Sequence, residues 1–409
     1  MAGRSRLIGT TGLVLGNLIG AGILALPISL GVAGLVPSVL LMLVYSAMML
    51  FSAEVLARES AEERNPTFDY PTLYGRYLGR AGKWIAVVTN AIILYGLLVA
   101  YVAGGSKIIA SVLGLDGSPA WLALAFAAAL TVLTMLDLSV IDKYNTVLVF
   151  GLLFAFVGLV GVSCDKIDFA SFGDSHWEYF GLAIPLVVTA AHFHNIIPTL
   201  SADLGWDLKT LRKAMLLGML FAVVMNLAWV ACGIGCLPRL GDHGLIASYV
   251  QAVPATVPMG KVLNRHVFSV LAVTFSLVAI ATSFLANGIG LQNFVRDLCW
   301  NSFRVKSRLL VRLLTFAPPT VIALLWPDVF IKALDVVGGI GIVTLFGILP
   351  CVLALRKRGV SRAFRWFAAI FLVLSLVALV TVIGGFCGSK LLKPNPADEA
   401  VPTVEGVLK

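Results

Sequence analysis

Long apolar runs make up most of the chain, and short segments that carry most of the charged residues separate them. A helix needs about 20 apolar residues to cross the roughly 30 Å hydrocarbon core of a bilayer, and the runs reach this length about eleven times. The strands of a transmembrane barrel would instead be short segments of alternating hydrophobicity. The pattern therefore predicts an all-α polytopic membrane protein with about 11 transmembrane helices. We place the spans at residues 7–30, 33–57, 84–113, 120–136, 146–163, 180–200, 214–237, 267–291, 309–326, 329–355 and 365–387.

The composition excludes a water-soluble domain. Of the 409 residues, 59% are hydrophobic and 12% are charged, and the mean hydropathy is +0.96. A soluble domain carries about 25% charged residues, and a disordered chain is poor in apolar residues. The net charge of +9 fits cytoplasmic loops that follow the positive-inside rule, so we expect no nucleic-acid partner.

The distribution of Lys and Arg predicts the orientation. Most of them lie in residues 58–83, 209–213, 296–312 and 356–365, which share one side of the membrane if the N-terminus is cytoplasmic. An odd number of spans then places the C-terminus outside. Within residues 58–83 we expect a short interfacial helix with four apolar or aromatic residues on one side, namely Tyr70, Leu73, Tyr74 and Tyr77.

A glycine-rich stretch interrupts the first span. Gly16, Gly20 and Gly22 lie within seven residues, Pro27 follows, and each glycine costs about 1 kcal/mol relative to Ala in a helix. Uncovered backbone groups cost several kcal/mol more in lipid, so such a segment is favoured where it lines a cavity. Its N–H groups would bind a carboxylate, and its carbonyls would bind an ammonium group or a cation. The alternative is a small-residue packing face, because Gly16 and Gly20 form a GxxxG motif.

A second unusual stretch lies midway along the sixth span. His192, His194 and Asn195 follow Thr189 there, and Pro198 removes a backbone hydrogen bond and clashes with the carbonyl of residue 194. Ionisable residues inside a span are candidates for function. The alternative for each histidine is a neutral, hydrogen-bonded residue of the core. No third ligand with suitable spacing accompanies the pair, so we expect no metal site and no cofactor.

The two stretches occupy matching places in two halves of five spans. Corresponding interrupted segments are the best sequence indication of the midplane binding site of a secondary transporter. Because span six enters from the opposite side, the halves would form a 5+5 inverted repeat. The expected divisions are residues 1–163 for spans one to five, 164–355 for spans six to ten, 356–388 for span eleven, and 389–409 for a disordered tail.

Four segments resemble one family of transporters. They are GNLIGAGILALPISLGVAGLVPS (16–38), LYGLLVAYVAGG (94–105), FHNIIPTL (193–200) and TSFLANGIGLQNF (282–294). They are similar to the tyrosine/tryptophan permeases, which are bacterial aromatic amino acid permeases of the amino acid–polyamine–cation superfamily with a LeuT-like fold. The likeness runs from about residue 7 to 388, and related hydroxy-amino-acid carriers share parts of the first segment. It implies proton-coupled uptake of tyrosine or tryptophan across the bacterial cytoplasmic membrane.

The resemblance also implies a binding site. The amides of Gly20, Ala21 and Gly22 would bind the substrate carboxylate, and the carbonyl of Leu18 would bind the ammonium group together with the backbone near His192. Spans one, three, six, eight and ten would form the side-chain pocket, in which Gly338 and Gly339 provide room. An aromatic ring needs apolar walls and one polar partner. The expected substrate-binding residues are Asn17, Leu18, Gly20, Ala21, Gly22, Tyr95, Tyr101, His192, Phe193, His194, Asn195, Asn287, Gly338 and Gly339.

Two coupling ions agree with the sequence. Histidine suits a proton, with His194 as the first candidate and His192 as the second. Sodium is the alternative: Thr282 and Ser283 would supply hydroxyl ligands, and Ile19 and Gly22 would supply carbonyls. Such hydroxyls also bond back to the helix carbonyl four residues earlier.

Other functional classes fit less well. An intramembrane enzyme that used both histidines would need a further carboxylate or ligand at membrane depth, and the spans offer none in a clear position. A channel would need a ring-forming filter motif, which the sequence does not contain. Tyrosine, tryptophan and phenylalanine all suit the pattern as substrates.

Overall fold

A computed structural model describes the chain as a bundle of helices. It describes residues 2–20, 22–65, 68–115, 118–135, 138–302, 304, 306–388 and 396, with the backbone alone at 2–5, 138–150, 301 and 302. Among these residues the one pairing of β type is an isolated bridge between Gly34 and Ser175. The predicted tail, apart from Pro396, and the predicted ligand Ala21 lie outside the described residues.

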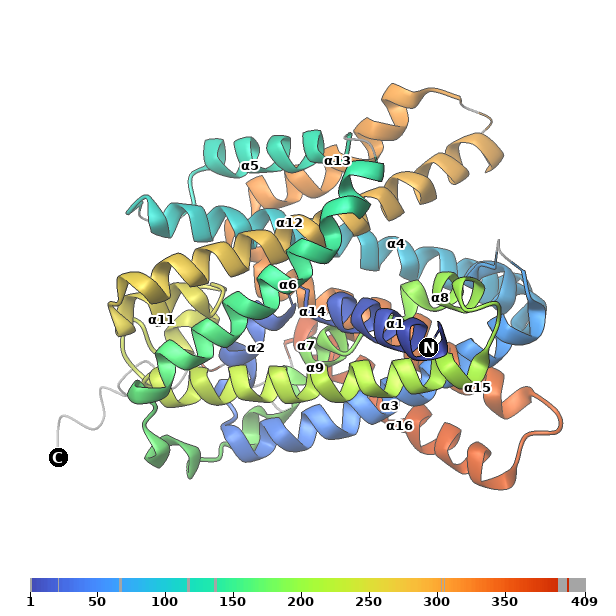
Figure 1. The fold of residues 1–409 in the computed structure, drawn as a ribbon, viewed down its shortest axis with the longest axis horizontal. Helices are drawn as coiled ribbons and strands as arrows, with labels where there is room; N and C mark the ends of the chain where they lie inside the picture. Colours follow the sequence, from blue (N-terminus) through green and yellow to red (C-terminus); the bar gives the residue numbers. More distant parts are fainter. Residues whose placement is uncertain are drawn as a thin grey trace.

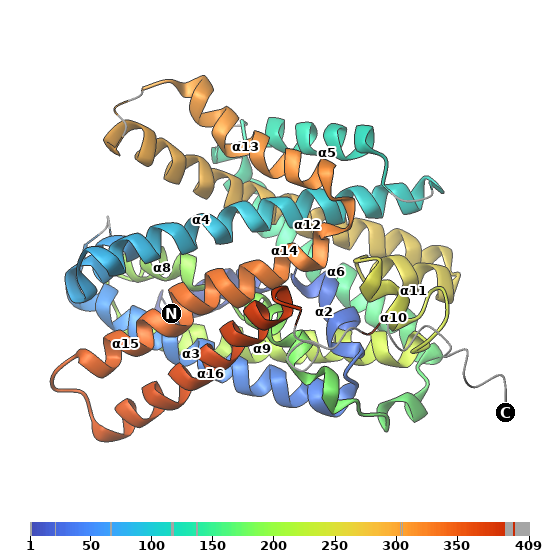
Figure 2. The same ribbon diagram turned by 180° about the vertical axis from the view of Figure 1, so that it is seen from behind.

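Most helices run along the long axis of the molecule (Figures 1 and 2). The helices up to Ala183 are α1 (Ala2–Leu18), α2 (Gly22–Gly31), α3 (Leu35–Glu63), α4 (Tyr70–Val112), α5 (Ala120–Leu133), α6 (Leu138–Ser163), η1 (Cys164–Lys166), η2 (Phe169–Phe172) and η3 (Trp177–Ala183). The helices from Ile184 onward are α7 (Ile184–Ala190), η4 (His194–Ile196), α8 (Ile197–Asp203), α9 (Leu208–Cys236), α10 (Leu245–Val250), α11 (Thr256–Leu263), α12 (His266–Asp297), η5 (Leu298–Ser302), α13 (Arg308–Leu325), η6 (Pro327–Val329), α14 (Phe330–Val336), η7 (Val337–Ile348), α15 (Leu349–Arg356) and α16 (Arg362–Phe386).

Within the described part of the chain, 8 helices are long and apolar enough to cross a membrane, or 9 if α1 and α2 count as one bent span. The predicted fourth and fifth spans correspond to α5, which is shorter, and to α6, which begins eight residues before the predicted start at 146. The total of eleven therefore stays a prediction.

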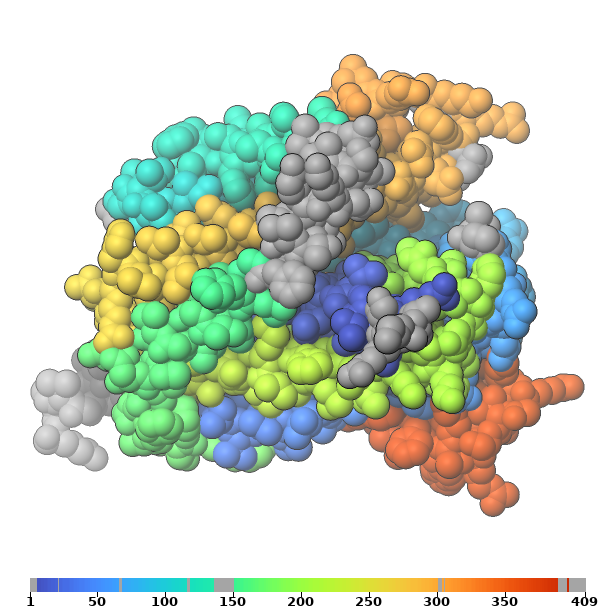
Figure 3. Space-filling view, viewed as in Figure 1, coloured from blue at the N-terminus to red at the C-terminus, as the bar shows by residue number. Residues whose placement is uncertain are grey.

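The first predicted span is two helices. α1 ends at Leu18, α2 begins at Gly22, and their axes differ by 57°. All residues of α2 are buried. α1 instead lies at the surface on the face seen in Figure 3, beside α9. The glycines of the sequence thus coincide with a change of direction and of environment.

The sixth predicted span changes conformation at the histidines. α7 ends at Ala190, the backbone at Phe193 is non-helical with φ −143°, and a short 3-10 turn leads into α8 at Ile197. The two changes of direction touch each other, because a Cβ on Gly22 would lie 3.5 Å from the Cα of Ala190. Residues 168 positions apart in sequence therefore meet inside the bundle.

The expected interfacial helix is the first part of α4. Gly79, with φ 71°, kinks the helix, and only glycine adopts this conformation without strain. Tyr70 and Tyr74 are buried, and their hydroxyls donate to the carbonyls of His194 and Leu345 respectively. This segment therefore fastens the sixth span to η7.

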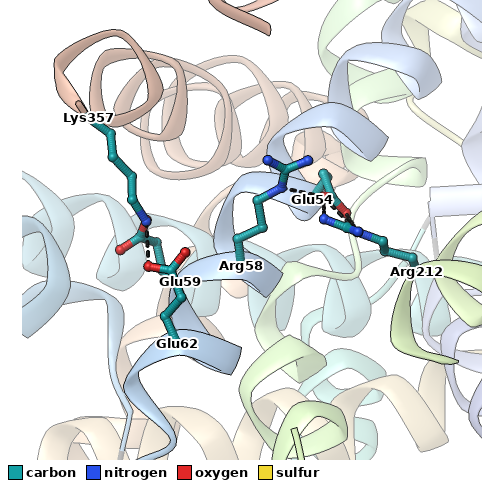
Figure 4. A network of polar contacts seen from close by, with 6 residues as sticks. All are labelled: Glu54, Arg58, Glu59, Glu62, Arg212 and Lys357. Carbon is teal, nitrogen blue, oxygen red and sulfur yellow. Dashed lines mark hydrogen bonds and ion pairs between the residues drawn. The ribbon is translucent and has the colours of Figure 1, made fainter. Parts of the chain in front are cut away.

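Charged groups connect the helices at the end of the bundle where α3 ends and α15 turns into α16 (Figure 4). Glu54 of α3 accepts from Arg58 and from Arg212 of α9. Lys357 donates to Glu59 and Glu62, each at 2.6 Å. Burial lowers the pKa of Lys357, but the bonds to both carboxylates outweigh this effect and raise it above its ordinary value. Each cation in this network has a carboxylate partner.

A second set of polar contacts joins helices at the opposite end of the bundle. The buried ammonium of Lys107, near the end of α4, pairs with Asp328 of η6 at 2.7 Å. It also donates to the carbonyls of Gln251 and Ala252, in the loop between α10 and α11. One lysine thus holds this loop and η6 against α4.

Candidate functional site

The two interrupted spans border one cavity of about 250 Å³. Its size is just below the roughly 300–1,000 Å³ of typical ligand pockets, which suits a small molecule. α1, α2, α4, α6, α7, η4 and α12 contribute to the wall. The predicted site residues that line it are Asn17, Leu18, Gly20, Gly22, Tyr101, His192, Asn195, Thr282, Ser283 and Asn287.

At both interruptions, some backbone N–H groups of the described chain have no backbone hydrogen-bond acceptor. The carbonyl of Gly20 accepts from Ile23 N–H at 3.1 Å, but within the described chain no backbone acceptor bonds the N–H of Gly20 or Gly22. The same holds for the N–H of Phe193 and His194. A Cβ on Gly20 would lie 3.3 Å from Ser283 Oγ, so glycine brings this backbone close to α12. Because Gly20 and Gly22 line the cavity, the first interruption offers peptide donors to an anionic group there.

Tyr101 and Asn287 form the polar part of the opposite wall. The Asn287 amide donates to Tyr101 Oη at 3.2 Å and to the Ser283 carbonyl at 2.9 Å. The Tyr101 ring lies 6.5 Å from that of Phe284. An amide and a phenol held in place beside aromatic rings suit a ligand with both an apolar body and a polar atom.

The two histidines face different surroundings. His192 lines the cavity, and its buried Nε2 has no hydrogen-bond partner in the described structure. His194 is fully buried outside the lining, where its Nε2 lies 2.7 Å from Ser52 Oγ and 3.1 Å from the Met49 carbonyl. The rings are nearly parallel with centroids 5.8 Å apart, and both contact Phe346. The histidines thus form a stack that leads from the cavity into the core.

Several predicted site residues lie away from the cavity. Tyr95 donates its hydroxyl to the Leu314 carbonyl of α13 at 2.7 Å, and so does not line the pocket. Phe193 is fully buried in the core, and Ile19 is buried behind the break. His194 faces α3 rather than the cavity. The side chains of Tyr95, Phe193 and His194 therefore do not form the wall of this cavity, whereas the roles predicted for the Phe193 backbone and the Ile19 carbonyl stay predictions.

Gly338 and Gly339 serve close packing rather than substrate room. A Cβ on Gly338 would overlap the Pro185 carbonyl of α7, and one on Gly339 would overlap Val382 of α16. Neighbouring helices fill the space beside both glycines, and no residue of span ten lines this cavity, so a contribution of span ten to substrate binding stays a prediction. Span five contributes instead through Leu152, which the sequence analysis missed. Leu97, one turn before Tyr101, also lines the cavity, and its position on the same helix face was the available signal.

One of the two hydroxyl groups expected to bind sodium, that of Thr282, donates within its own helix. Thr282 Oγ1 donates to the carbonyl of Val278 at 2.9 Å and to that of Ala279 at 3.2 Å. This is the back-bonding that hydroxyl side chains adopt in apolar helices.

A cavity between interrupted helices at the centre of a membrane bundle is the architecture of a secondary transporter. Two solved structures share the fold of this chain. A crystal structure of the Eremococcus coleocola manganese transporter, in complex with an aromatic bis-isothiourea substituted compound, superposes with a TM-score of 0.60 at 13% identity, over 93% of this chain and 87% of that one. A mutant of the same transporter gives 0.62 at 13% identity, over 98% and 89%. The predicted LeuT-like, all-α fold class is thereby confirmed.

The chain belongs to the tryptophan/tyrosine permease family, whose model matches residues 4–387. It is 30% identical to a tyrosine-specific transport system of Haemophilus influenzae, over 82% of this chain and 84% of that protein. It is 29% identical to a tryptophan-specific transport protein of Pseudomonas aeruginosa, over 91% and 92%. A low affinity tryptophan permease of Escherichia coli is 28% identical over 84% and 86%. The predicted family is confirmed, and the chain is a transporter rather than an enzyme.

Proposed function

We propose that the protein imports an aromatic amino acid, tyrosine or tryptophan, across the bacterial inner membrane by proton symport with alternating access. The observation that carries the proposal is the cavity at which the breaks after Leu18 and Ala190 meet. The names of the relatives support the substrate class. The N-terminus would be cytoplasmic and the C-terminus outside.

The substrate would lie across the two breaks. Its carboxylate would accept from the open N–H groups of Gly20 and Gly22 at the start of α2, where the helix dipole favours negative charge. Its ring would lie between Leu97 and Ala286, within reach of the Tyr101 hydroxyl and the Asn287 amide. One polar pair beside apolar walls suits a phenol or an indole N–H.

The cavity would open towards the cytoplasm in this conformation. Its lining includes Gly12, Leu13 and Gly16 of α1, on the side of the first break that we assign to the cytoplasm. On the other side of the break, every residue of α2 is buried. A rocking movement of the helices would close the cavity to the cytoplasm and open it to the outside.

Proton coupling would use the histidine stack. His192 reaches the cavity and has a free buried nitrogen, so it can exchange a proton with the site. Nδ1 of His194 is likewise buried without a partner in the described structure, while its Nε2 contacts Ser52 and Met49. Sodium is the alternative ion. We favour the proton because His192 reaches the cavity with a buried nitrogen that has no partner in the described structure.

Transport in liposomes tests the proposal. We expect labelled tryptophan or tyrosine to accumulate under an imposed pH gradient, acidic outside, without sodium. Accumulation that requires a sodium gradient would refute proton coupling, and uptake of neither amino acid by folded protein would refute the substrate class.

One pair of variants and one single variant test the roles assigned to these residues. Tyr101→Phe removes a hydroxyl at the cavity and should raise KM severalfold, whereas Tyr95→Phe removes one bonded to α13 and should not. His194→Ala should weaken proton-driven accumulation more than exchange, because exchange needs no net proton movement. Equal losses in both assays would assign His194 to binding or folding.

A further inference from the structure

A separate pocket of about 250 Å³ lies where α12 ends and α13 begins. Its lining consists of Gln292, Arg296, Trp300, Arg308, Val311 and Arg312. The hairpin formed by these two helix ends projects from the bundle in both ribbon views (Figures 1 and 2, orange). The pocket shares no residue with the cavity between the interrupted spans.

The charge of this pocket is uncompensated. Three of its lining residues are arginines and none is acidic. Among the described residues, Arg296, Arg308 and Arg312 form no ion pair, whereas each cation of the network in Figure 4 has a carboxylate partner. Like charges gathered in one pocket repel one another, and a bound anion would relieve that repulsion. Guanidinium groups match a phosphate group in both charge and hydrogen-bonding geometry.

A neutral donor points to the same ligand. The indole Nε1 of Trp300 is buried and has no hydrogen-bond partner in the described structure. A buried donor without an acceptor costs about 1–3 kcal/mol, so an oxygen of a bound group would stabilise it. The Arg296 guanidinium lies 5.6 Å from the centre of the Trp300 ring, which brings the donor and this charge to one side of the pocket.

The surroundings of the pocket are those of a membrane interface. Next to Arg308 and Arg312, Leu309 is 68% exposed and Leu313 is 53% exposed, so α13 presents apolar side chains to its surroundings beside the arginines. Tryptophan and arginine together are typical of the headgroup level of a bilayer. By the orientation proposed above, this end of the bundle meets the cytoplasmic leaflet, where anionic lipids attract basic pockets between helices.

We propose that this pocket binds the headgroup of an anionic phospholipid. The phosphate accepts hydrogen bonds from Arg296, Arg308 and Arg312, and a headgroup oxygen accepts from Trp300 Nε1. The acyl chains lie along the exposed leucines of α13. The lipid joins α12, which carries Asn287 of the substrate cavity, to α13.

Lipid binding to the purified full-length protein tests the proposal. The delipidated protein in detergent is titrated with dioctanoyl phosphatidylglycerol, dioctanoyl phosphatidylcholine or inorganic phosphate, and bound lipid is counted by native mass spectrometry. One variant combines Arg296→Gln, Arg308→Gln and Arg312→Gln. Its control combines Arg80→Gln, Lys83→Gln and Arg362→Gln, which removes the same charge from exposed positions outside the pocket.

We expect the pocket variant to bind phosphatidylglycerol at least tenfold more weakly than the wild type, and the control to stay within twofold of it. Trp300→Phe, which keeps the ring and removes the donor, should weaken binding severalfold. Equal losses in both triple variants would assign the binding to general surface charge and overturn the proposal. Equal binding of phosphatidylcholine, or displacement of the lipid by inorganic phosphate at matched concentration, would overturn it as well. If the pocket variant elutes as aggregate, Arg312→Gln alone gives the same comparison. We expect it to weaken binding severalfold, and unchanged binding would refute the site.

Discussion

Replacing Gly338 with alanine tests the packing that separates span ten from the substrate cavity. The added Cβ would overlap the carbonyl oxygen of Pro185 and would lie 2.8 Å from its carbonyl carbon. That carbonyl also accepts from Thr189 Oγ1 at 3.0 Å, and the same hydroxyl donates to the Leu334 carbonyl at 3.1 Å. The Cβ would also overlap Thr189 Oγ1, but because the nearest obstructing atom is backbone, no side-chain rotation removes the clash.

The expected loss follows from these contacts. Overpacking a tight interior costs about 1–3 kcal/mol, and backbone obstruction places Gly338→Ala at the upper end. Displacing α7 also stretches the hydrogen bonds of Thr189, each worth about 1 kcal/mol. We therefore expect a loss of about 3–4 kcal/mol in the free energy of unfolding. Substrate affinity should fall too, because α7 ends at the cavity beside His192.

Gly290→Ala is the matched control. Its Cβ would lie 3.8 Å from Leu94 Cδ2, an ordinary contact, and its position within α12 should gain up to about 1 kcal/mol from helix propensity. Thermal unfolding in detergent, with and without tryptophan, compares the two variants. If Gly338→Ala has the melting temperature of the wild type and binds tryptophan with the same affinity, α7 and η7 are not packed in this way.

Three further predictions concern other contacts. Gly20→Val should abolish substrate binding without unfolding the protein, because its side chain obstructs the open amides and approaches Ser283; unchanged affinity in a titration would contradict the role of the first break. Glu59→Gln should cost about 1–2 kcal/mol in thermal unfolding, since it leaves the half-buried Lys357 with Glu62 alone. The hydrogen bond from Arg265 lowers the pKa of the exposed Asp165 below its ordinary 3.8, so this pair stabilises the fold above that pH and stops doing so as the pH falls through the lowered value. Arg265→Gln should therefore lower the melting temperature at pH 7, and this deficit should shrink below pH 3.8.

Local chemistry was sufficient to predict the helices and the two unusual segments. Apolar runs long enough to span a bilayer have few other stable conformations, because backbone groups in lipid must bond within the segment. The glycines of residues 16–22 weaken a helix wherever they occur, and Pro198 removes a hydrogen bond in any context. α1 ends within the glycine stretch, at Leu18, and α8 begins at Ile197 with Pro198 in its first turn.

Which side chains face the cavity was not predictable in the same way. Tyr95 and Tyr101 are six residues apart on α4, which rotates their side chains by about 240° relative to each other. Only the positions of α12 and α13 determine that Tyr101 meets Asn287 and Tyr95 meets Leu314. His192 and His194 both carry an imidazole that can hold a proton. The backbone of the break directs His192 into the cavity and His194 towards Ser52.

Patterns along the chain were enough to predict a helical membrane protein with interrupted first and sixth spans, and to find its resemblance to the aromatic amino acid permeases. These properties follow from short-range chemistry and from motifs carried by neighbouring residues. Tertiary structure alone decided that Gly338 packs against Pro185 instead of leaving room for a substrate, and that Arg296 shares a pocket with Arg308 and Arg312. The physical reason is that such contacts join residues far apart in the chain, and their distances depend on how helices pack rather than on the sequence around each residue.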